Sequence, residues 1–143
     1  MAGIVKDVAP YVHKVAYYET DKMGITHHSN YVRFMEEARI DYSEKINYSF
    51  YRMEQEGVIS PTVSFHVELK RPTTFGDEIE IRVKFLTYTG VRYVFSYEMK
   101  NRKTGDVVAV CTSEHCFTDI NGRPVIIKKK FPEMHEYFSQ YIE

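Results

Sequence analysis

One stretch with the apolar periodicity of a helix, followed by stretches in which apolar and polar residues alternate, limits the architectures open to this chain. Apolar residues recur at intervals of three and four between residues 31 and 46, which places them on one face of a helix. These residues are Tyr31, Phe34, Met35, Ala38, Tyr42 and Ile46. Four later runs alternate apolar and polar residues, as half-buried strands do. A sheet with one apolar face and one helix to cover it predict an α+β protein in which the sheet wraps around the helix.

The expected elements follow one another without a linker or an internal repeat, so we predict one domain over residues 1–143. A first strand is expected over residues 11–18, after a loose N-terminal arm. Ser29 or Asn30 is a suitable N-cap for the long helix. The remaining expected elements are a helical turn over residues 51–56, an antiparallel meander of strands at 63–69, 79–85, 91–99 and 107–117, and a short amphipathic helix from Pro132.

Composition and charge exclude several classes of protein. The chain is 43% hydrophobic and 27% charged with a net charge of −1, which is typical of a globular protein and gives no global field for nucleic acid. No apolar stretch is long enough to span a membrane, and the N-terminus does not resemble a secretion signal. Cys111 and Cys116 are five residues apart on one expected strand, so they point to opposite faces and cannot bridge each other. We therefore expect a cytoplasmic protein.

Reactive side chains concentrate at the junction where a polar loop enters the long helix, between residues 17 and 39. The first N–H groups of a helix have no partner within it and carry partial positive charge, so they can hold a developing oxyanion. Asp21 lies a few residues upstream and could act on the same reacting carbon. A carboxylate together with an oxyanion site provides what acyl hydrolysis requires.

The segment VAYYETDKMGITHHSNYVRFMEEAR, residues 15–39, resembles the active-site segment of the 4-hydroxybenzoyl-coenzyme A thioesterase family. The family pattern is an aromatic strand end, Asp, Gly, His, a further aromatic residue, then an acid and Arg on the helix. Weaker similarity at residues 65–72 and 76–79 extends the resemblance over nearly the whole chain. It implies a hotdog fold: a five-stranded antiparallel sheet wrapped around one long helix, with a short C-terminal helix here. It also implies dimers that often pair into tetramers, and acyl-coenzyme A (acyl-CoA) hydrolysis without a metal or cofactor.

The resemblance assigns roles residue by residue. Asp21 takes the place of the catalytic carboxylate, as nucleophile or as general base. His28, seven residues later, takes the place of the pattern histidine, and its backbone N–H would be the oxyanion donor. Tyr17, four residues before Asp21, matches a tyrosine that some branches place beside the site. Gly24, Asn30 and Tyr31 fall within the pattern as candidate substrate-binding residues.

The phosphates of coenzyme A require cations at the surface. Arg92, just after the expected turn at Thr89-Gly90, is one candidate, and Lys70 and Arg71 are others. The run Lys128-Lys129-Lys130 is interpreted as a solvated surface patch.

Each assignment has a structural alternative. Asp21 could serve as the first residue of an Asx turn, and His28 could be a capping or packed histidine. Tyr17 could pack at an interface, and Tyr31 could line either the core or the acyl pocket. A metal site is disfavoured, because adjacent histidines rarely ligate one ion together and no typical ligand spacing is present.

Two other functions stay open from the sequence. The acyl group of the substrate could be attached to acyl carrier protein instead of coenzyme A. Alternatively, the domain could be a non-catalytic ligand-binding or assembly module. The residues also leave open the acyl group and the choice between dimer and tetramer. A strand edge and one flank of the helix would remain uncovered in a single copy, which favours pairing with a second one.

Overall fold

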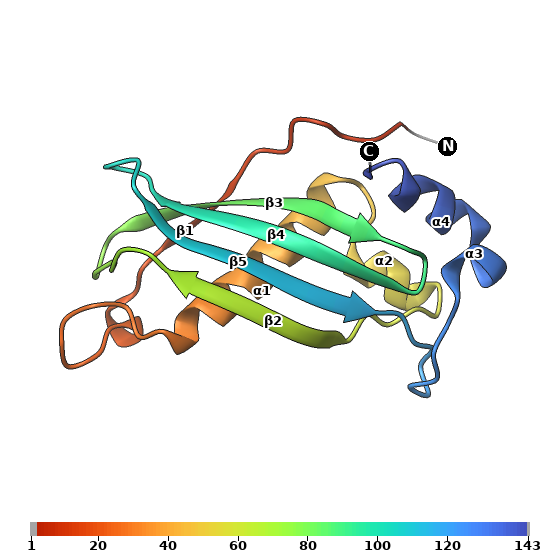
Figure 1. The fold of residues 1–143 in the computed structure, drawn as a ribbon, viewed down its shortest axis with the longest axis horizontal. Helices are drawn as coiled ribbons and strands as arrows, with labels where there is room; N and C mark the ends of the chain where they lie inside the picture. The colour runs from red at the N-terminus through yellow and green to blue at the C-terminus, as the bar shows by residue number, and fades with distance from the viewer. Residues whose placement is uncertain (1–2, 143) are drawn as a thin grey trace.

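The computed structural model describes residues 3–142 (Figure 1). In chain order the elements are β1 (Tyr11–Lys14), η1 (Tyr17–Glu19), α1 (Ser29–Lys45), α2 (Phe50–Gln55), β2 (Thr62–Leu69), β3 (Glu78–Tyr88), β4 (Arg92–Asn101), β5 (Val107–Cys116), α3 (Ile127–Lys130) and α4 (Pro132–Ser139).

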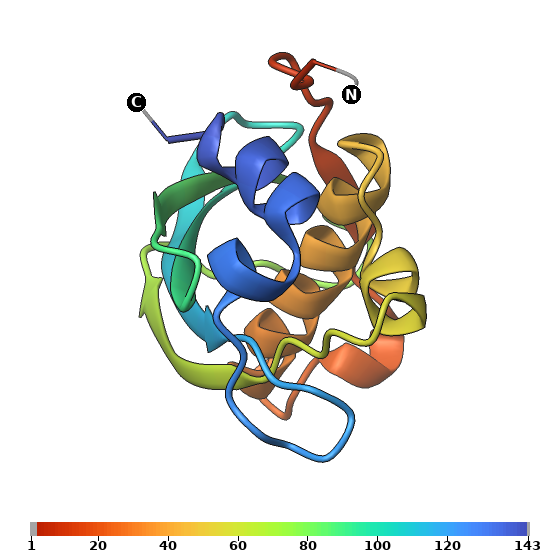
Figure 2. The same cartoon turned by 90° about the vertical axis from the view of Figure 1, so that its right-hand side faces the viewer.

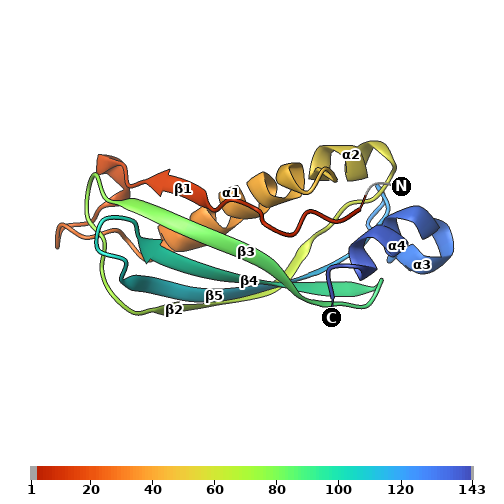
Figure 3. The same ribbon diagram turned by 90° about the horizontal axis from the view of Figure 1, so that it is seen from above.

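The five strands form one antiparallel sheet in the order β1-β3-β4-β5-β2. The sheet curls around α1, which lies against its concave face (Figures 2 and 3). All six apolar residues of the predicted helical stripe are buried. On β4, Tyr93, Phe95, Tyr97 and Met99 are buried in alternation with more exposed neighbours, as the period of two predicts. The predicted hotdog arrangement, a five-stranded antiparallel sheet around one long helix, is confirmed.

The predicted meander of four strands is wrong in its first member. β3, β4 and β5 are joined as consecutive hairpins, but β2 pairs with β5 at the far edge instead of with β3. The chain between β2 and β3 therefore crosses the end of the sheet, and β3 takes its place beside β1. Hydrophobic alternation decides which face of a strand is buried and leaves the order of the strands undetermined.

Three local boundaries also differ from the sequence prediction. β1 ends at Lys14, because the chain turns into η1, where the Glu19 carboxylate accepts the Ala16 N–H. The N-cap of α1 is His28, so the helix begins at Ser29, and neither Ser29 nor Asn30 is its cap. The N-terminal arm is tied down, since the Val5 N–H donates to the Tyr141 hydroxyl at 3.1 Å.

The two ends of the sheet carry different features. The loop from η1 into α1 lies at one end, whereas α2, α3 and α4 gather at the other (Figure 1). The short helix α3, which the sequence did not predict, contains Lys128, Lys129 and Lys130, all exposed. Cys111 is buried and Cys116 half-buried, and both are free thiols. Within residues 3–142, no helix is long and apolar enough to cross a membrane.

A chain of polar side chains runs beneath α1. Arg39 donates to the Tyr97 hydroxyl at 3.2 Å, and Tyr97 shares a hydrogen bond with Ser113. The Ser113 hydroxyl in turn lies 2.7 Å from Nε2 of His115, whose other nitrogen contacts Thr62. Burial, and secondarily the positive charge of Arg39, lower the pKa of His115 from 6.5 to about 3.

We expect His115 to make folding stability fall in mild acid. The unfolded chain takes up a proton at His115 below about pH 6.5, while the folded protein keeps the ring neutral down to about pH 3. The contribution of the neutral His115 ring to the free energy of unfolding is complete above the pKa of His115 in the unfolded chain. Below that pKa it declines by about 1.4 kcal/mol per pH unit. Between about pH 7 and pH 5, the wild type should lose about 2 kcal/mol more than His115→Gln in urea unfolding. Parallel pH dependences in the two proteins would contradict this assignment.

Candidate active site

The loop that contains Asp21 is a tight hairpin. Thr20 and Thr26 form an antiparallel bridge, and the Asp21 N–H donates to the Ile25 carbonyl at 2.9 Å. Gly24 closes the turn with a φ of 81°, in the left-handed region where a residue without Cβ is unstrained. The sequence proposed Gly24 for substrate binding, and the structure gives it this backbone role.

Buried hydroxyls fix the hairpin to the segment before β3. The Thr26 hydroxyl lies 2.7 Å from that of Thr73, which also lies 2.9 Å from the Tyr31 hydroxyl. The Thr74 hydroxyl donates to the Gly24 carbonyl at 2.8 Å. Tyr31 is buried, and burial raises the pKa of its hydroxyl. Of the two alternatives for Tyr31, the structure favours the core.

The Asp21 carboxylate is divided between its own turn and the open surface. Oδ1 accepts the Met23 N–H at 2.8 Å, which is the Asx turn that the sequence offered as an alternative. Oδ2 makes no hydrogen bond to any of residues 3–142, and the side chain is half-buried. One oxygen thus holds the turn, and the other is available to a ligand.

An unpaired amide lies at the start of α1. His27, the residue before the N-cap, accepts two amides of the first turn: its Nδ1 accepts the Ser29 N–H at 3.2 Å, and its carbonyl accepts the Asn30 N–H at 3.0 Å. The His28 N–H has no acceptor within the described part of the chain. This unpaired amide belongs to the N-cap residue, at the positive end of a 17-residue helix.

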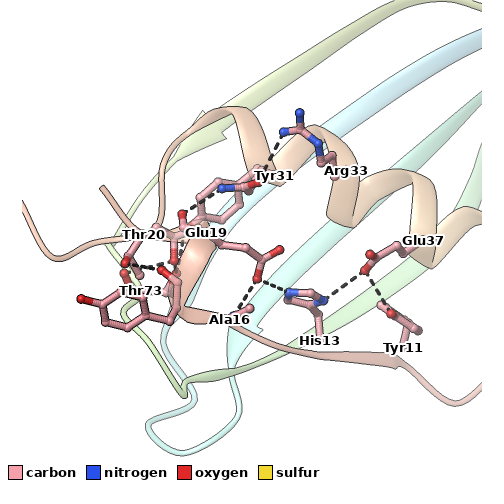
Figure 4. Close-up of polar contacts among 12 residues, drawn as sticks. Tyr11, His13, Ala16, Glu19, Thr20, Tyr31, Arg33, Glu37 and Thr73 are labelled. Atoms are coloured by element: carbon pink, nitrogen blue, oxygen red, sulfur yellow. Dashed lines mark hydrogen bonds and ion pairs between the residues drawn. The ribbon is translucent and has the colours of Figure 1, made fainter. Parts of the chain in front are cut away.

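Three further residues of this region were missed by the sequence analysis. Glu19 is buried, and its Oε1 lies 2.8 Å from Nε2 of His13 (Figure 4). The other ring nitrogen of His13 lies 3.0 Å from Oε2 of Glu37 on α1. No short-range spacing joins these three positions. The one sequence signal that could have pointed to this cluster is Glu19 itself, an acid that directly follows the aromatic residues Tyr17 and Tyr18.

The remaining residues predicted for this end of the molecule lie around the hairpin. Tyr17 is 75% exposed and packs edge-on against Phe75. Asn30 donates through Nδ2 to the Glu19 carbonyl at 2.8 Å, so its amide holds the loop. Lys70 and Arg71 are exposed just beyond the end of β2, where Lys70 lies 3.7 Å from Glu68.

The predicted phosphate-binding Arg92 lies elsewhere. It begins β4 at the opposite end of the sheet, next to the turn in which the Gly90 carbonyl accepts the Ile127 N–H of α3 at 2.9 Å. Its guanidinium donates to Glu114 at 2.7 Å. Within one copy of the chain, Arg92 is therefore not brought together with Asp21.

The edge of the sheet at β2 is open and apolar. β2 pairs with β5, and its other side has no partner among residues 3–142. Phe65 and Leu69 lie opposite the buried residues Ser113 and Ala109, so they share the concave face, yet each is more than half exposed. Apolar side chains on an unpaired edge are typical of an interface between chains.

The described residues contain no group of three or more His, Cys, Asp or Glu side chains that could hold a metal ion. An apolar hollow does occur, but it is lined by residues such as Tyr48, Met53 and Phe138 near α2 and α4. The helices α2 and α4 lie at the end of the sheet opposite the loop that leads from η1 into α1 (Figure 3).

An antiparallel sheet wrapped around one helix places the chain among hotdog-fold proteins. Comparison with known proteins narrows that class. Residues 15–140 match the model of the thioesterase-like superfamily, and the chain belongs to this superfamily.

Individual relatives agree with this assignment. The chain is 30% identical over 128 residues to the putative acyl-CoA thioesterase YneP of Bacillus subtilis, covering 89% of this chain and 92% of that protein. It is 27% identical over 103 residues to the acyl-CoA thioester hydrolase YbgC of Escherichia coli, covering 68% and 77%. The crystal structure of a DHNA-CoA thioesterase from Staphylococcus aureus superposes with a TM-score of 0.86 at 30% identity, covering 92% and 89%.

Proposed function

We propose that this protein is a cytoplasmic acyl-CoA thioesterase of the 4-hydroxybenzoyl-CoA thioesterase type, formed by residues 1–143 as one hotdog domain. It hydrolyses an acyl-CoA thioester to the free acid and coenzyme A without a cofactor. The observation that carries the proposal is that one loop–helix segment contains both the Asp21 carboxylate, with one free oxygen, and the His28 N–H, which has no acceptor among residues 3–142. The superfamily and the names of the relatives support the same substrate class.

In the mechanism we propose, Asp21 acts on water. Its free carboxylate oxygen takes a proton from a water molecule, and the resulting hydroxide attacks the thioester carbon. The His28 N–H and the positive end of α1 stabilise the oxyanion of the tetrahedral intermediate. The C–S bond then breaks, the coenzyme A thiolate leaves as a good leaving group and takes up the proton from Asp21, and the acid is released.

Direct attack by Asp21 is the alternative course. The carboxylate would displace the thiolate to form a mixed anhydride, which water would then hydrolyse. Label found in Asp21 after a single turnover in ¹⁸O-labelled water would establish direct attack. Label in Asp21 itself requires attack by water on the enzyme's half of the anhydride, whereas the general-base course puts label in the product acid alone.

We propose that the functional unit is a homodimer formed through the open edge of β2, either alone or as one half of a dimer of dimers. A twofold axis would pair two β2 strands in antiparallel orientation, so that the Asp21 end of one copy meets the α3 end of the other. The exposed Phe65 and Leu69 would then contribute to the acyl pocket. In that arrangement, Arg92 and Lys128 of the partner could approach the phosphates of a coenzyme A bound near Asp21, as could Lys70 and Arg71.

The experiment that tests the function is a hydrolysis panel. Purified protein is given aromatic, short-chain and long-chain acyl-CoA thioesters, and release of free thiol is recorded. We expect kcat/KM of at least about 10⁴ M⁻¹s⁻¹ for one class, which is the lower range for enzymes with their own substrates. Thiol release at the buffer rate with every thioester would refute the proposal.

A carrier-protein donor is the second candidate, and one observation favours it. Arg123, Lys128, Lys129 and Lys130 are all exposed at one end of the molecule, which suits an acidic carrier. Assaying the same acyl group on coenzyme A and on acyl carrier protein distinguishes the two donors. A hotdog module without catalytic activity would bind the acyl compound and release no thiol from either.

A further inference from the structure

Glu19 is a buried acid that lies outside the proposed catalytic pair. The residue is 4% exposed and lies in the short helix η1, two residues before Asp21. Burying a carboxylate is costly unless strong partners compensate. Its partners therefore indicate what the position does.

The main chain of Glu19 holds the segment that carries His28. Its carbonyl oxygen accepts the His27 N–H at 2.8 Å and the Nδ2 hydrogen of Asn30, also at 2.8 Å. These two donors flank His28 on either side in the sequence. The Glu19 peptide group is thus tied to the segment that carries the unpaired His28 N–H.

The side chain of Glu19 is fixed to the body of the protein. A single oxygen, Oε1, accepts the Ala16 N–H at 2.7 Å and contacts Nε2 of His13 at 2.8 Å. The His13 ring is itself held on β1, by Glu37 at 3.0 Å and by the Phe34 ring at a centroid distance of 4.0 Å. Figure 4 shows this series of contacts leading from Glu19 through His13 to Glu37 on α1.

A further contact strengthens the far end of this series. The Tyr11 hydroxyl donates to the same Glu37 oxygen at 3.0 Å. Burial, and then the hydrogen bond to the Glu37 carboxylate, raise the pKa of Tyr11 to about 12, so the hydroxyl keeps its proton. Two strand residues and one helix residue therefore hold the Glu19 carboxylate in place.

We propose that Glu19 is a positioning residue that sets the Asp21 carboxylate and the His28 amide relative to each other. Its carboxylate is anchored to β1 and α1, its carbonyl directs the His28 segment, and Asp21 follows it by two residues. The inference rests on the proposed function, because it assumes that Asp21 and His28 act on one thioester. A misplacement of about 1 Å at a catalytic group can cost about 100-fold in rate.

The kinetic test compares two substitutions at one position. Glu19→Ala removes the acceptor for Ala16 and His13, and we expect kcat to fall about 10- to 100-fold while KM changes less than about threefold. Glu19→Gln retains an acceptor oxygen, and we expect it to recover kcat to within about fivefold of the wild type. Glu44→Gln, an exposed acid near the end of α1, serves as the control without an effect.

Amide hydrogen exchange provides a readout that does not depend on activity. The His27 amide should exchange at least about tenfold faster in Glu19→Ala than in the wild type, with exchange in β3 and β4 unchanged. A wild-type exchange rate at His27, or a normal kcat in folded Glu19→Ala, would overturn the positioning role. If the wild type proves to hydrolyse no thioester, the proposed function fails, and the exchange experiment still decides whether Glu19 holds the loop.

Discussion

Asp21→Asn is expected to lower kcat for acyl-CoA hydrolysis by about 10²–10⁴-fold while the protein stays folded. Asparagine keeps the oxygen that accepts the Met23 N–H, so the Asx turn of the hairpin survives. It removes the negative charge that would deprotonate water or attack the carbon. Steady-state thiol release, with circular dichroism as the check on folding, measures both effects.

The matched control is Asp106→Asn, which makes the same change in the exposed turn between β4 and β5. It should keep wild-type activity. Because the turn survives in Asp21→Asn, a fall in activity there would reflect lost chemistry and not a distorted loop. Full activity in Asp21→Asn would mean that another group performs the chemistry.

Phe65→Glu is expected to dissociate the proposed dimer. Phe65 is 56% exposed on the concave side of an edge strand whose outer side is unpaired in the described structure. A charge there would be buried without a partner in the dimer, and substitutions at central interface residues raise dissociation constants by about 30- to 1,000-fold. Analytical ultracentrifugation should show the wild type at about twice the 16.9 kDa chain mass and the variant near one chain mass.

Leu86→Glu is the control for this experiment, because Leu86 is 55% exposed on β3, away from the β2 edge. It should remain dimeric and active. Hydrolysis by Phe65→Glu should recover at high protein concentration, as mass action restores the dimer. A monomeric wild type with full activity would refute the shared active site.

The parts of the fold that depend on local periodicity could be predicted from the sequence. The stripe from Tyr31 to Ile46 and the alternation along β4 each follow from side chains a few residues apart. The pairing of β2 with β5 depends on contacts between positions at least forty residues apart, and the pattern of either strand alone does not encode it. Tyr17 and Tyr18 favour a strand by propensity, but the Glu19 carboxylate turns the chain into η1 first.

The candidate site divides in the same way. Asp21 and His28 could be proposed as site residues because they are seven residues apart within a segment that resembles a known family. The packing of β1 on α1 brings together His13, Glu19 and Glu37. Their contact therefore could not be predicted from the sequence without the fold. Arg92 was assigned by its place after a turn, yet topology puts that turn at the other end of the sheet.

A crystal structure with a non-hydrolysable acyl-CoA analogue, in which a methylene group replaces the thioester sulfur, most directly tests how the site works. We expect the carbonyl oxygen of the analogue within about 2.7–3.1 Å of the His28 nitrogen. The free oxygen of Asp21 should face the carbonyl carbon, either in contact or through one water molecule. An analogue bound with its carbonyl group away from both residues would contradict the account.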